Sequence, residues 1–114
     1  MIFMKKITIR LLSLVLLGAF IPSFVLAAEW DLRDGSITVN AAPDTAQTVT
    51  QGSGAPTVDD NPVITSSGTT SNTVTITAAE NATANVTLEN VNINTGGAAI
   101  TTSGDVNIEL NGTN

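Results

Sequence analysis

Carboxylates are the main side chains with which this chain could do chemistry. Residues 28–114 contain ten Asp and Glu residues but no His, Cys, Tyr or Lys. Without these four residue types there is no Ser-His-Asp or Cys-His nucleophile, no imidazole or thiolate zinc site and no Schiff-base lysine. Carboxylates could still bind Ca²⁺ or act together as a glycosidase pair.

The acidic segment Asp59-Asp60-Asn61 is the first candidate, because its oxygens are suitable ligands for Ca²⁺. It lacks the D-x-[DN]-x-[DN]-G spacing of a calcium-binding loop. In the same way, Gly96-Gly97 is not followed by the G-x-D of a calcium-binding repeat. The sequence therefore predicts a solvated loop at residues 59–61 and assigns no metal ligand.

Glu89 and Glu109 are the second candidate, since each ends a similar segment, Val86–Glu89 and Val106–Glu109. The equal spacing of the two copies predicts that these carboxylates stack on neighbouring strands. Neighbouring strands lie about 4.8 Å apart, closer than the about 5–5.5 Å of a retaining glycosidase pair. We therefore expect a charged outer corner, with no catalytic residue, no cofactor and no enzymatic activity in this chain.

Two features could bind a ligand without catalysis. Trp30 could stack on a sugar ring, although a single aromatic residue near a mature N-terminus more often covers the end of the core. Thr73, Thr75 and Thr77 form a ladder like that of an ice-binding face, which needs the same spacing on adjacent strands. The predicted adjacent positions break this pattern, so we expect an ordinary strand surface. Those positions are Asn85/Thr87/Glu89 and Asp105/Asn107/Glu109.

The start of the sequence, residues 1–27, indicates where the chain works. Lys5 and Lys6 precede the apolar run Leu11–Leu26, and compact residues follow at the end of that run. This order is typical of a secretory signal peptide, and the run is shorter than the about 20 apolar residues of a membrane-spanning helix. We predict a helical signal peptide cleaved between Ala27 and Ala28, and a secreted or cell-surface product.

The predicted mature chain is strongly acidic. Arg33 is the one cationic residue beside ten acidic residues in positions 28–114, which gives a formal charge of −9. This charge argues against binding of nucleic acid and, after signal cleavage, against a membrane partner. The lack of Cys removes disulfides, which often compensate for a small core in secreted chains, and also removes a lipoprotein anchor.

Alternating apolar residues predict an all-β fold. No long segment keeps apolar residues at the helical i, i+3, i+4 and i+7 spacing, whereas Thr and Val, which favour strands, are abundant. The clearest predicted strand, at residues 73–77, has Val74 and Ile76 facing inward. An earlier strand at residues 36–40 has Ile37 and Val39 on one face.

The stretch between Ala41 and Asn61 is less regular. It contains two prolines and two glycines, and only Thr48-Val49-Thr50 within it is strand-like. Proline removes a ladder donor and glycine weakens a strand interior, so both argue against a strand here. We expect a loop or an irregular first turn, followed by a short strand at Pro62–Thr65.

The segment around residue 90 predicts a sharp change of direction. Val86/Leu88 and Val91/Ile93 lie in opposite alternation phases, so the chain must turn at Glu89-Asn90 to keep both pairs inside. A two-residue hairpin is one solution, although Glu-Asn is a poor match to its Asn-Gly preference. A solenoid corner, with Asn90 at positive φ, is the other. A small antiparallel β-sandwich is accordingly the alternative to a solenoid fold.

Three segments carry a resemblance to the right-handed parallel β-helix regions of large bacterial cell-surface proteins, often described as carbohydrate-binding or pectate-lyase-like repeat proteins. They are Thr73–Thr77 (TVTIT), Ala84–Asn94 (ANVTLENVNIN) and Val106–Asn114 (VNIELNGTN). Trp30-Asp31-Leu32 and Gly35–Val39 resemble the first strand of such regions. The resemblance implies the N-terminal rungs of a right-handed parallel β-helix. It implies no lyase site, since no position matches the calcium and basic-residue cluster of lyases with this fold.

The predicted organisation has three parts. Residues 1–27 are the signal peptide, residues 28–61 an initial strand with an irregular cap, and residues 62–114 the β-helix rungs. The last predicted strand stops without the polar cap that protects a solenoid end. We therefore expect the chain to be the N-terminal fragment of a longer protein and to self-associate through the open end.

We predict a secreted or cell-surface β-solenoid segment with a structural and adhesive role. Its expected partners are extracellular glycans or a host surface, with Trp30 as a candidate glycan contact. The alternative is the front part of a carbohydrate-active enzyme, either a polysaccharide lyase or a glycosidase, whose catalytic rungs lie beyond residue 114. The coding sequence downstream of Asn114 would separate these two predictions.

Overall fold

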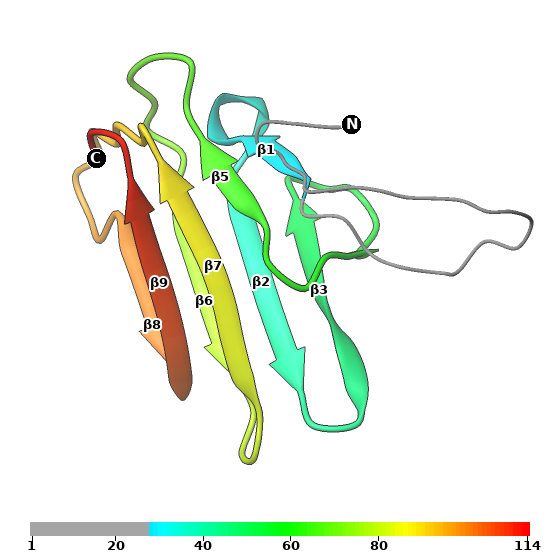
Figure 1. Cartoon of the computed structure of the whole chain (residues 1–114). Helices are drawn as coiled ribbons and strands as arrows, with labels where there is room; N and C mark the ends of the chain where they lie inside the picture. Colours follow the sequence, from blue (N-terminus) through cyan, green and yellow to red (C-terminus); the bar gives the residue numbers. More distant parts are fainter. Residues whose placement is uncertain (1–27) are drawn as a thin grey trace, which may run out of the picture.

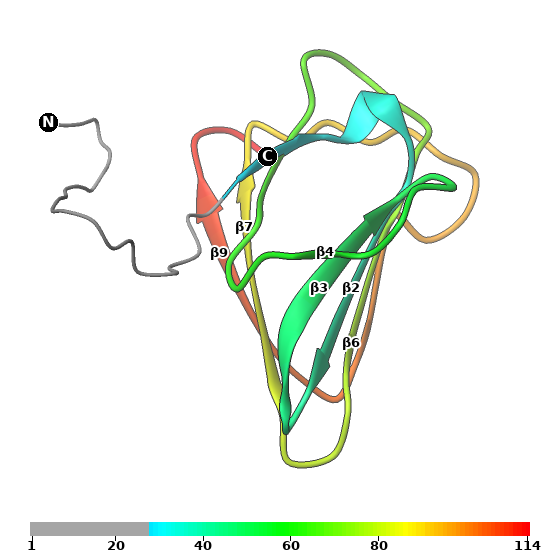
Figure 2. The same ribbon diagram turned by 90° about the vertical axis from the view of Figure 1, so that its right-hand side faces the viewer.

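A computed structural model describes residues 28–114, which form two β-sheets that face each other (Figures 1 and 2). Ala27, one side of the predicted cleavage site, lies outside the described residues, whereas Ala28 lies within them. Among the described residues the only helix is the short 3₁₀ turn η1 (Leu32–Asp34), and none is long and apolar enough to cross a membrane. The all-β prediction is confirmed for this part of the chain.

Sheet A has four strands and sheet B has five. In spatial order, sheet A consists of β1 (Glu29–Asp31), β5 (Val63–Thr65), β7 (Thr83–Glu89) and β9 (Asp105–Asn111). Sheet B consists of β4 (Thr57–Val58), β3 (Thr45–Gln51), β2 (Ile37–Ala42), β6 (Val74–Ala78) and β8 (Ile100–Ser103).

Most of the strand pairings are parallel. All neighbours in sheet A are parallel, and so are the β2–β6 and β6–β8 pairs of sheet B. Antiparallel pairing, which the sandwich alternative requires, is confined to the β2–β3 and β3–β4 pairs at one edge of sheet B. From β5 onward, successive strands alternate between the two sheets. The strands of sheet A run upward in Figure 1, whereas β2, β6 and β8 run downward behind them.

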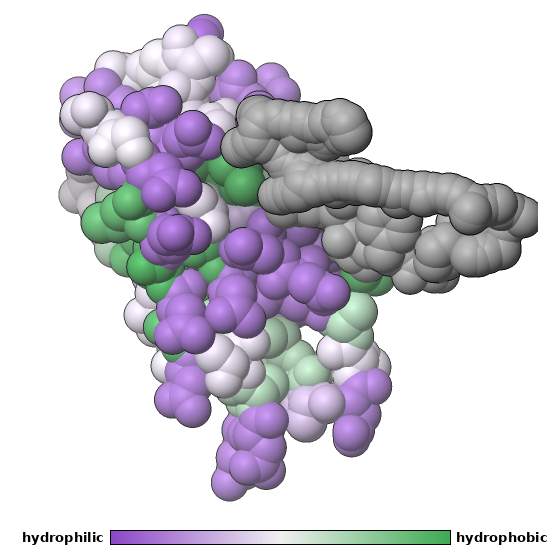
Figure 3. All heavy atoms as spheres, viewed as in Figure 1, coloured by the Kyte–Doolittle hydropathy of each residue, from purple (hydrophilic) through white to green (hydrophobic). Residues whose placement is uncertain are grey.

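The β9 strand at one edge of sheet A leaves apolar side chains at the surface. Leu110 is 64% exposed and Ile108 is 37% exposed, although the alternation of β9 points both toward the interior side of the sheet. Figure 3 shows hydrophobic residues at this side of the molecule, next to the hydrophilic surface of sheet A. Within the described residues, no strand pairs with the outer edge of β9.

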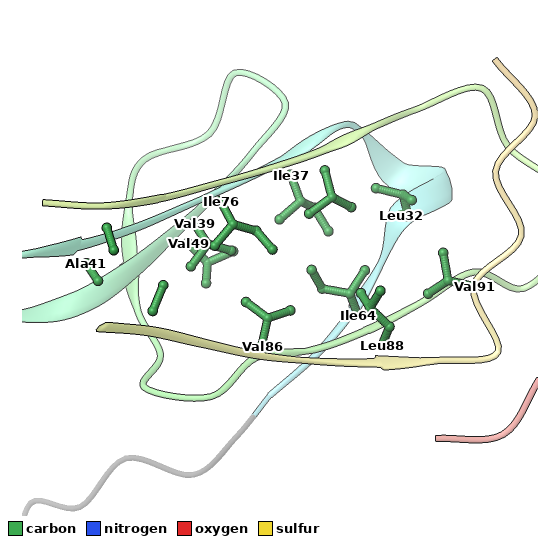
Figure 4. Packing of buried hydrophobic residues seen from close by; sticks show 13 residues of the cluster. Leu32, Ile37, Val39, Ala41, Val49, Ile64, Ile76, Val86, Leu88 and Val91 are labelled. Carbon is green, nitrogen blue, oxygen red and sulfur yellow. The ribbon is translucent and has the colours of Figure 1, made fainter. Parts of the chain in front are cut away.

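The core fills the space between the two sheets (Figure 4). Its side chains come from the inward positions of the alternating strands, as the sequence predicts for Ile37, Val39, Val74 and Ile76, all at most 1% exposed. Burying one such side chain contributes about 1.5–3 kcal/mol. The other members of the cluster are Leu32, Ala41, Val49, Ile64, Ala78, Ala84, Val86, Leu88 and Val91.

The predicted corner at residue 90 is confirmed. Strand β7 ends at Glu89, and Asn90 has a φ of 56°, a left-handed conformation that Asn tolerates better than most residues. Val91 is buried beyond the corner, and Leu88 is buried before it. The change of alternation phase therefore marks a bend that keeps both side chains in the core.

The prediction of a loop or an irregular turn between residues 41 and 61 is wrong for residues 45–51. Strand β3 lies within this stretch and pairs along β2 in an antiparallel hairpin, with a turn at Pro43-Asp44. The inward positions of β3 are Gln47 and Val49, so a polar residue interrupts the expected apolar alternation. Gln47 is buried because its carboxamide finds hydrogen-bond partners in the interior.

Candidate functional site

The outer side of sheet B carries a regular set of small polar side chains. Because successive side chains of a strand alternate between the two faces, the residues beside the buried Val39, Val49 and Ile76 point away from the core. We call the resulting surface the hydroxyl face. It consists of Thr38 and Asn40 on β2, Thr48 and Thr50 on β3, Thr75 and Thr77 on β6, and Thr101 and Ser103 on β8.

The pairing register arranges the hydroxyl face in two straight rows across the sheet. The first row is Thr50–Thr38–Thr75–Thr101, and the second is Thr48–Asn40–Thr77–Ser103. Neighbouring strands lie about 4.8 Å apart, and alternate residues of one strand about 6.6–6.8 Å apart. The two rows therefore form a regular array of hydroxyl and amide groups.

The strands predicted to lie beside Thr73–Thr77 are not its neighbours in the structure. Strand β6 pairs with β2 and β8 of sheet B, whereas β7 and β9, which contain residues 85–89 and 105–109, belong to sheet A. The prediction compared consecutive strands along the chain, but consecutive strands alternate between sheets. The predicted neighbours are therefore wrong, although Asn40 and Ser103, the true neighbours of Thr77, also interrupt the Thr ladder.

The polar groups of the hydroxyl face have no hydrogen-bond partner in the described part of the chain. Within residues 28–114, none of its eight side chains makes a hydrogen bond to another residue. The contrast is clear on the outer side of sheet A, where the Asn107 amide donates to Asn85 Oδ1 at 3.1 Å. There, Thr87 Oγ1 also lies 3.4 Å from Glu109 Oε1. Polar side chains on the outer side of sheet A thus hydrogen bond partly to one another, whereas those of the hydroxyl face do not do so within residues 28–114.

Charge also separates the two surfaces. All eight residues of the hydroxyl face are neutral. On sheet A, the positions that alternate with the inward residues Trp30, Leu88 and Val106 include five carboxylates. These are Glu29, Asp31, Glu89, Asp105 and Glu109. Hydrogen bonding by the hydroxyl face therefore suits a neutral partner rich in hydroxyl groups.

The predicted stacking of Glu89 on Glu109 is wrong. In the register between β7 and β9, Glu109 pairs with Thr87, and Glu89 pairs with Asn111. Every even offset between two strands keeps the same side chains inward, so the alternation alone does not distinguish this register from the predicted one. The two carboxylates therefore do not sit opposite each other on adjacent strands.

Trp30 lies on β1 opposite Ile64 and packs, half-buried, against the core. Its indole Nε1 donates a hydrogen bond of 2.8 Å to Asp59 Oδ2. The polar end of the indole is therefore engaged inside the protein, as the core-covering interpretation requires. Contact between Trp30 and a glycan stays a prediction.

The predicted solvated loop at residues 59–61 is wrong for Asp59, which is only 1% exposed. Its carboxylate accepts hydrogen bonds from Trp30 Nε1, from the Ala28 backbone nitrogen at 3.1 Å and from the Asn61 backbone nitrogen at 3.2 Å. Within the described part of the chain, no cluster of three or more acidic, His or Cys side chains could hold a metal ion. Asp59 thus acts as an internal acceptor for N–H groups.

Gln47 connects the two sheets, and sequence reasoning missed it. Its Oε1 accepts from the Asn85 nitrogen at 2.9 Å, and its Nε2 donates to the Asn85 carbonyl at 3.0 Å. Strand β5 pairs with β7 only from Thr87 onward. The Gln47 carboxamide therefore hydrogen bonds to the Asn85 backbone at a position of β7 that has no partner on β5. The signal in the sequence is a polar residue two positions before Val49, on the inward side of a Thr-Val-Thr strand.

Asp31 at the start of η1 organises another connection. Its carboxylate accepts from the Arg33 backbone nitrogen at 3.0 Å and from Ser67 Oγ at 2.8 Å. These hydrogen bonds hold the pKa of the Asp31 carboxyl below its ordinary value, with a smaller contribution from the Arg33 charge. The carboxylate is solvent-exposed, so it ties the β1 end of sheet A to the loop after β5 without forming a buried ion pair.

Comparisons with known proteins place this chain in no family. Neither a family model nor a curated protein matches the sequence, and no solved structure matches the fold.

Proposed function

We propose that this protein is an exported β-solenoid segment with a structural and adhesive role, and that the hydroxyl face binds neutral glycans at an extracellular surface. The observation that carries the proposal is the pair of rows of uncharged hydroxyl and amide groups on sheet B. Single contacts of this kind are weak, and a repeated array gains affinity when the partner also repeats. Extended neutral polysaccharides present such a repeat of hydroxyl groups.

The path of the chain supports a right-handed parallel β-helix as the scaffold. In sheet A, Ile64 pairs with Leu88 and Val86 with Ile108, and in sheet B, Val74 pairs with Ile100. The sequence intervals between these partners agree with the period of about 20–50 residues that is typical of repeat architectures. In Figure 1 the chain runs up sheet A, down sheet B behind it, and advances leftward, which is the right-handed sense.

The sequence of residues 1–27 and the charge of the chain support an extracellular glycan partner. The basic start and the apolar run are the features of an export signal. The formal charge of −9 over residues 28–114 disfavours anionic surfaces and leaves neutral ones as the better class of partner. None of the residues of the hydroxyl face is a carboxylate, so no negative charge on this face opposes the close approach of a partner.

Sedimentation with insoluble polysaccharides tests the proposal. The secreted protein is mixed with cellulose or chitin particles, and the bound fraction is measured over a range of protein concentrations. We expect saturable binding to at least one of them. Replacing the central neighbours of one row, in a Thr38→Lys/Thr75→Lys variant, should weaken that binding about tenfold or more, since it removes two hydroxyls and places two strongly hydrated charges on the contact surface.

The matched control is an Asn85→Lys/Asn107→Lys variant, which changes two neighbouring polar residues on sheet A by the same charge. Its binding should equal that of the unmodified protein, and circular dichroism should show both variants folded. Equal losses in the two variants would contradict a role for the hydroxyl face. Absence of binding to both polysaccharides would contradict the glycan proposal.

Ice is the second candidate partner, and the regularity of the two rows favours it. A regular array of hydroxyl and methyl groups that lacks charge is the chemistry that could order water in register with a crystal surface. The test is ice-recrystallisation inhibition with the same two variants. Inhibition that disappears in Thr38→Lys/Thr75→Lys and persists in Asn85→Lys/Asn107→Lys would support ice as the partner, whereas no inhibition by the unmodified protein would exclude it.

A further inference from the structure

The buried carboxylate of Asp59 has hydrogen-bond donors but no cationic partner within residues 28–114. Its side chain is 1% exposed. Arg33 is the only cationic side chain in this part of the chain, and its guanidinium donates to Ser67 instead. A buried carboxylate without a countercharge is costly, even where neutral N–H groups hydrogen bond to it.

The nitrogen of Ala28 is one of the groups that contact this carboxylate. It lies 3.1 Å from Asp59 Oδ2, the oxygen to which Trp30 Nε1 also donates. The backbone around the carboxylate is fixed by Gln47, whose carbonyl accepts from the Asp59 nitrogen and whose Nε2 donates to the Asp59 carbonyl. Asp59 therefore holds a fixed acceptor oxygen within hydrogen-bond distance of the Ala28 nitrogen.

We propose that signal-peptide cleavage after Ala27 completes this site, because the α-ammonium group released at Ala28 forms an ion pair with the buried carboxylate of Asp59. The inference rests on the export and cleavage proposed above. In the precursor the Ala28 nitrogen is a neutral amide with one hydrogen. In the mature protein the same nitrogen carries a positive charge and three donors, so a charge-assisted hydrogen bond replaces a neutral one.

The chemical step is a hydrolysis by a signal peptidase. Water adds its hydroxyl to the carbonyl carbon of Ala27, the C–N bond to Ala28 breaks, and the nitrogen of Ala28 leaves as an amine. That amine takes up a proton at neutral pH, since an unperturbed α-amino group has a pKa of about 7.7–8.0. Ala28 itself is exposed, whereas Asp59 is buried, so the ion pair joins the surface start of β1 to the interior.

The position of the cleaved bond decides whether the ion pair forms. Consecutive Cα atoms are about 3.8 Å apart, so a start one residue earlier or later moves the ammonium away from the carboxylate. A mature chain that begins at Ala28 is consequently fixed at its first residue. β1 then gains a charged anchor in addition to its backbone pairing with β5.

The lack of lysine in residues 28–114 allows a direct experiment, because the α-amine of the mature protein is its only primary amine. The full precursor is expressed in a secreting host, and the N-terminus of the secreted product is determined by sequencing and intact mass. The folded protein is then treated with the N-hydroxysuccinimide ester of acetic acid. The rate of acetylation and the melting temperature before and after acetylation are measured.

We expect the amine to react about tenfold more slowly than in an Asp59→Asn variant, because the ion pair withholds it from the reagent. Acetylation removes the charge, so it should lower the melting temperature by about 4–8 °C in the unmodified protein and leave it nearly unchanged in Asp59→Asn. Asp60→Asn is the matched control, since Asp60 is the exposed neighbouring carboxylate, and it should behave like the unmodified protein.

A second variant avoids any change to the core. One Ser inserted between Ala27 and Ala28 shifts the ammonium by one residue and keeps Asp59, and acetylation of this product should not change its melting temperature. An Ala28 start with equal reaction rates and equal temperature shifts in all proteins would overturn the ion pair while leaving the export proposal intact. A secreted product with a different first residue would overturn the cleavage site and, with it, this inference.

Discussion

The two outer surfaces of this molecule differ although the inner patterns of their strands are alike. Both sheets place Val, Ile, Leu or Ala at alternate positions toward one shared core. Outward, sheet B presents eight neutral residues in two rows, whereas sheet A presents five carboxylates among polar residues that hydrogen bond to one another. The inward residues therefore determine the architecture, and the outward residues assign a separate chemistry to each sheet.

The difference also implies an orientation at a surface. Carboxylates are strongly hydrated, and removing them from water is costly, so sheet A is suited to remain in solvent. The hydroxyl face costs less to remove from water, because its groups are neutral and a partner can replace their hydrogen bonds to water. A partner that contacts the hydroxyl face would therefore leave the acidic surface facing outward.

The largest expected effect on stability comes from removing the hydrogen bonds through which Gln47 connects the two sheets. A Gln47→Met variant keeps an unbranched side chain of similar length but removes the hydrogen bonds of the Gln47 carboxamide to the nitrogen and carbonyl of Asn85 and to the carbonyl of Asp59. Buried unpaired backbone groups cost about 1–3 kcal/mol each, so we expect the free energy of unfolding to fall by about 2–4 kcal/mol. Urea denaturation followed by tryptophan fluorescence measures this change.

The control for that variant is Thr48→Val, on the adjacent outward position of the same strand. Thr48 makes no side-chain hydrogen bond to another described residue. The free energy of unfolding of the Thr48→Val variant should therefore differ from that of the unmodified protein by less than about 0.5 kcal/mol. A Gln47→Met protein as stable as the unmodified one would mean that the connection between the sheets is energetically unimportant.

The next largest effect is expected at Gly104, where the chain passes from β8 in sheet B to β9 in sheet A. Its φ is +82°, and a Cβ at this position would clash with the Ala78 carbonyl oxygen. Gly104→Ala must therefore shift backbone, at a cost of about 1–3 kcal/mol. Differential scanning calorimetry should show a clearly lower melting temperature.

Gly97→Ala is the matched control for Gly104→Ala. A Cβ at Gly97 would meet no atom within 4 Å, and its backbone does not have the positive φ that disfavours alanine. This variant should melt within about 2 °C of the unmodified protein or slightly above it. Equal destabilisation by the two substitutions would contradict a special requirement for glycine at the passage between the sheets.

Acid should affect sheet A through Asp31, whereas the hydroxyl face contains no titratable group. The folded-state pKa of Asp31 is lowered, so its contribution to stability is present above the unfolded pKa of about 3.9 and is lost as the pH falls through the folded value. Asp31→Asn should reduce the loss of melting temperature between pH 5 and pH 2.5. Thr75→Asn, on the hydroxyl face, should leave this pH dependence unchanged, and identical curves for all three proteins would refute the assignment.

The smallest effect on stability is expected at the exposed apolar edge of sheet A. Leu110 is 64% exposed, so Leu110→Thr should change the free energy of unfolding by less than about 0.5 kcal/mol. The same change should reduce self-association, because it replaces an apolar side chain on a strand whose outer edge is unpaired within residues 28–114. Sedimentation velocity over a range of concentrations compares the two proteins.

Parts of this fold follow from the sequence because they depend on local patterns. The inward positions of Val74 and Ile76 follow from simple alternation, and the corner at Asn90 follows from a change of phase between apolar pairs. Both inferences use residues only a few positions apart. The all-β character follows in the same way from the abundance of Thr and Val.

The features that were missed depend on contacts between residues far apart in the chain. Gln47 is buried because Asn85, 38 positions later, supplies partners for its carboxamide, and the pattern of β3 alone does not reveal them. The register of β9 on β7 was misjudged because even-numbered offsets preserve the alternation. The hydroxyl face was missed for a related reason: its rows combine strands from four separate segments, and their order in the sheet differs from their order in the sequence.

The hairpin of β2 and β3 has a consequence for how the chain reaches this structure. Its two strands are joined by a short turn at Pro43-Asp44, so their pairing closes a small loop, whereas the pairing of β2 with β6 joins Ile37 to the distant Val74. Local pairings form faster than distant ones, and synthesis delivers the N-terminal part of the chain first. We therefore expect the hairpin to act as the nucleus of a directional folding reaction, in which β6 and then β8 extend a template that already exists.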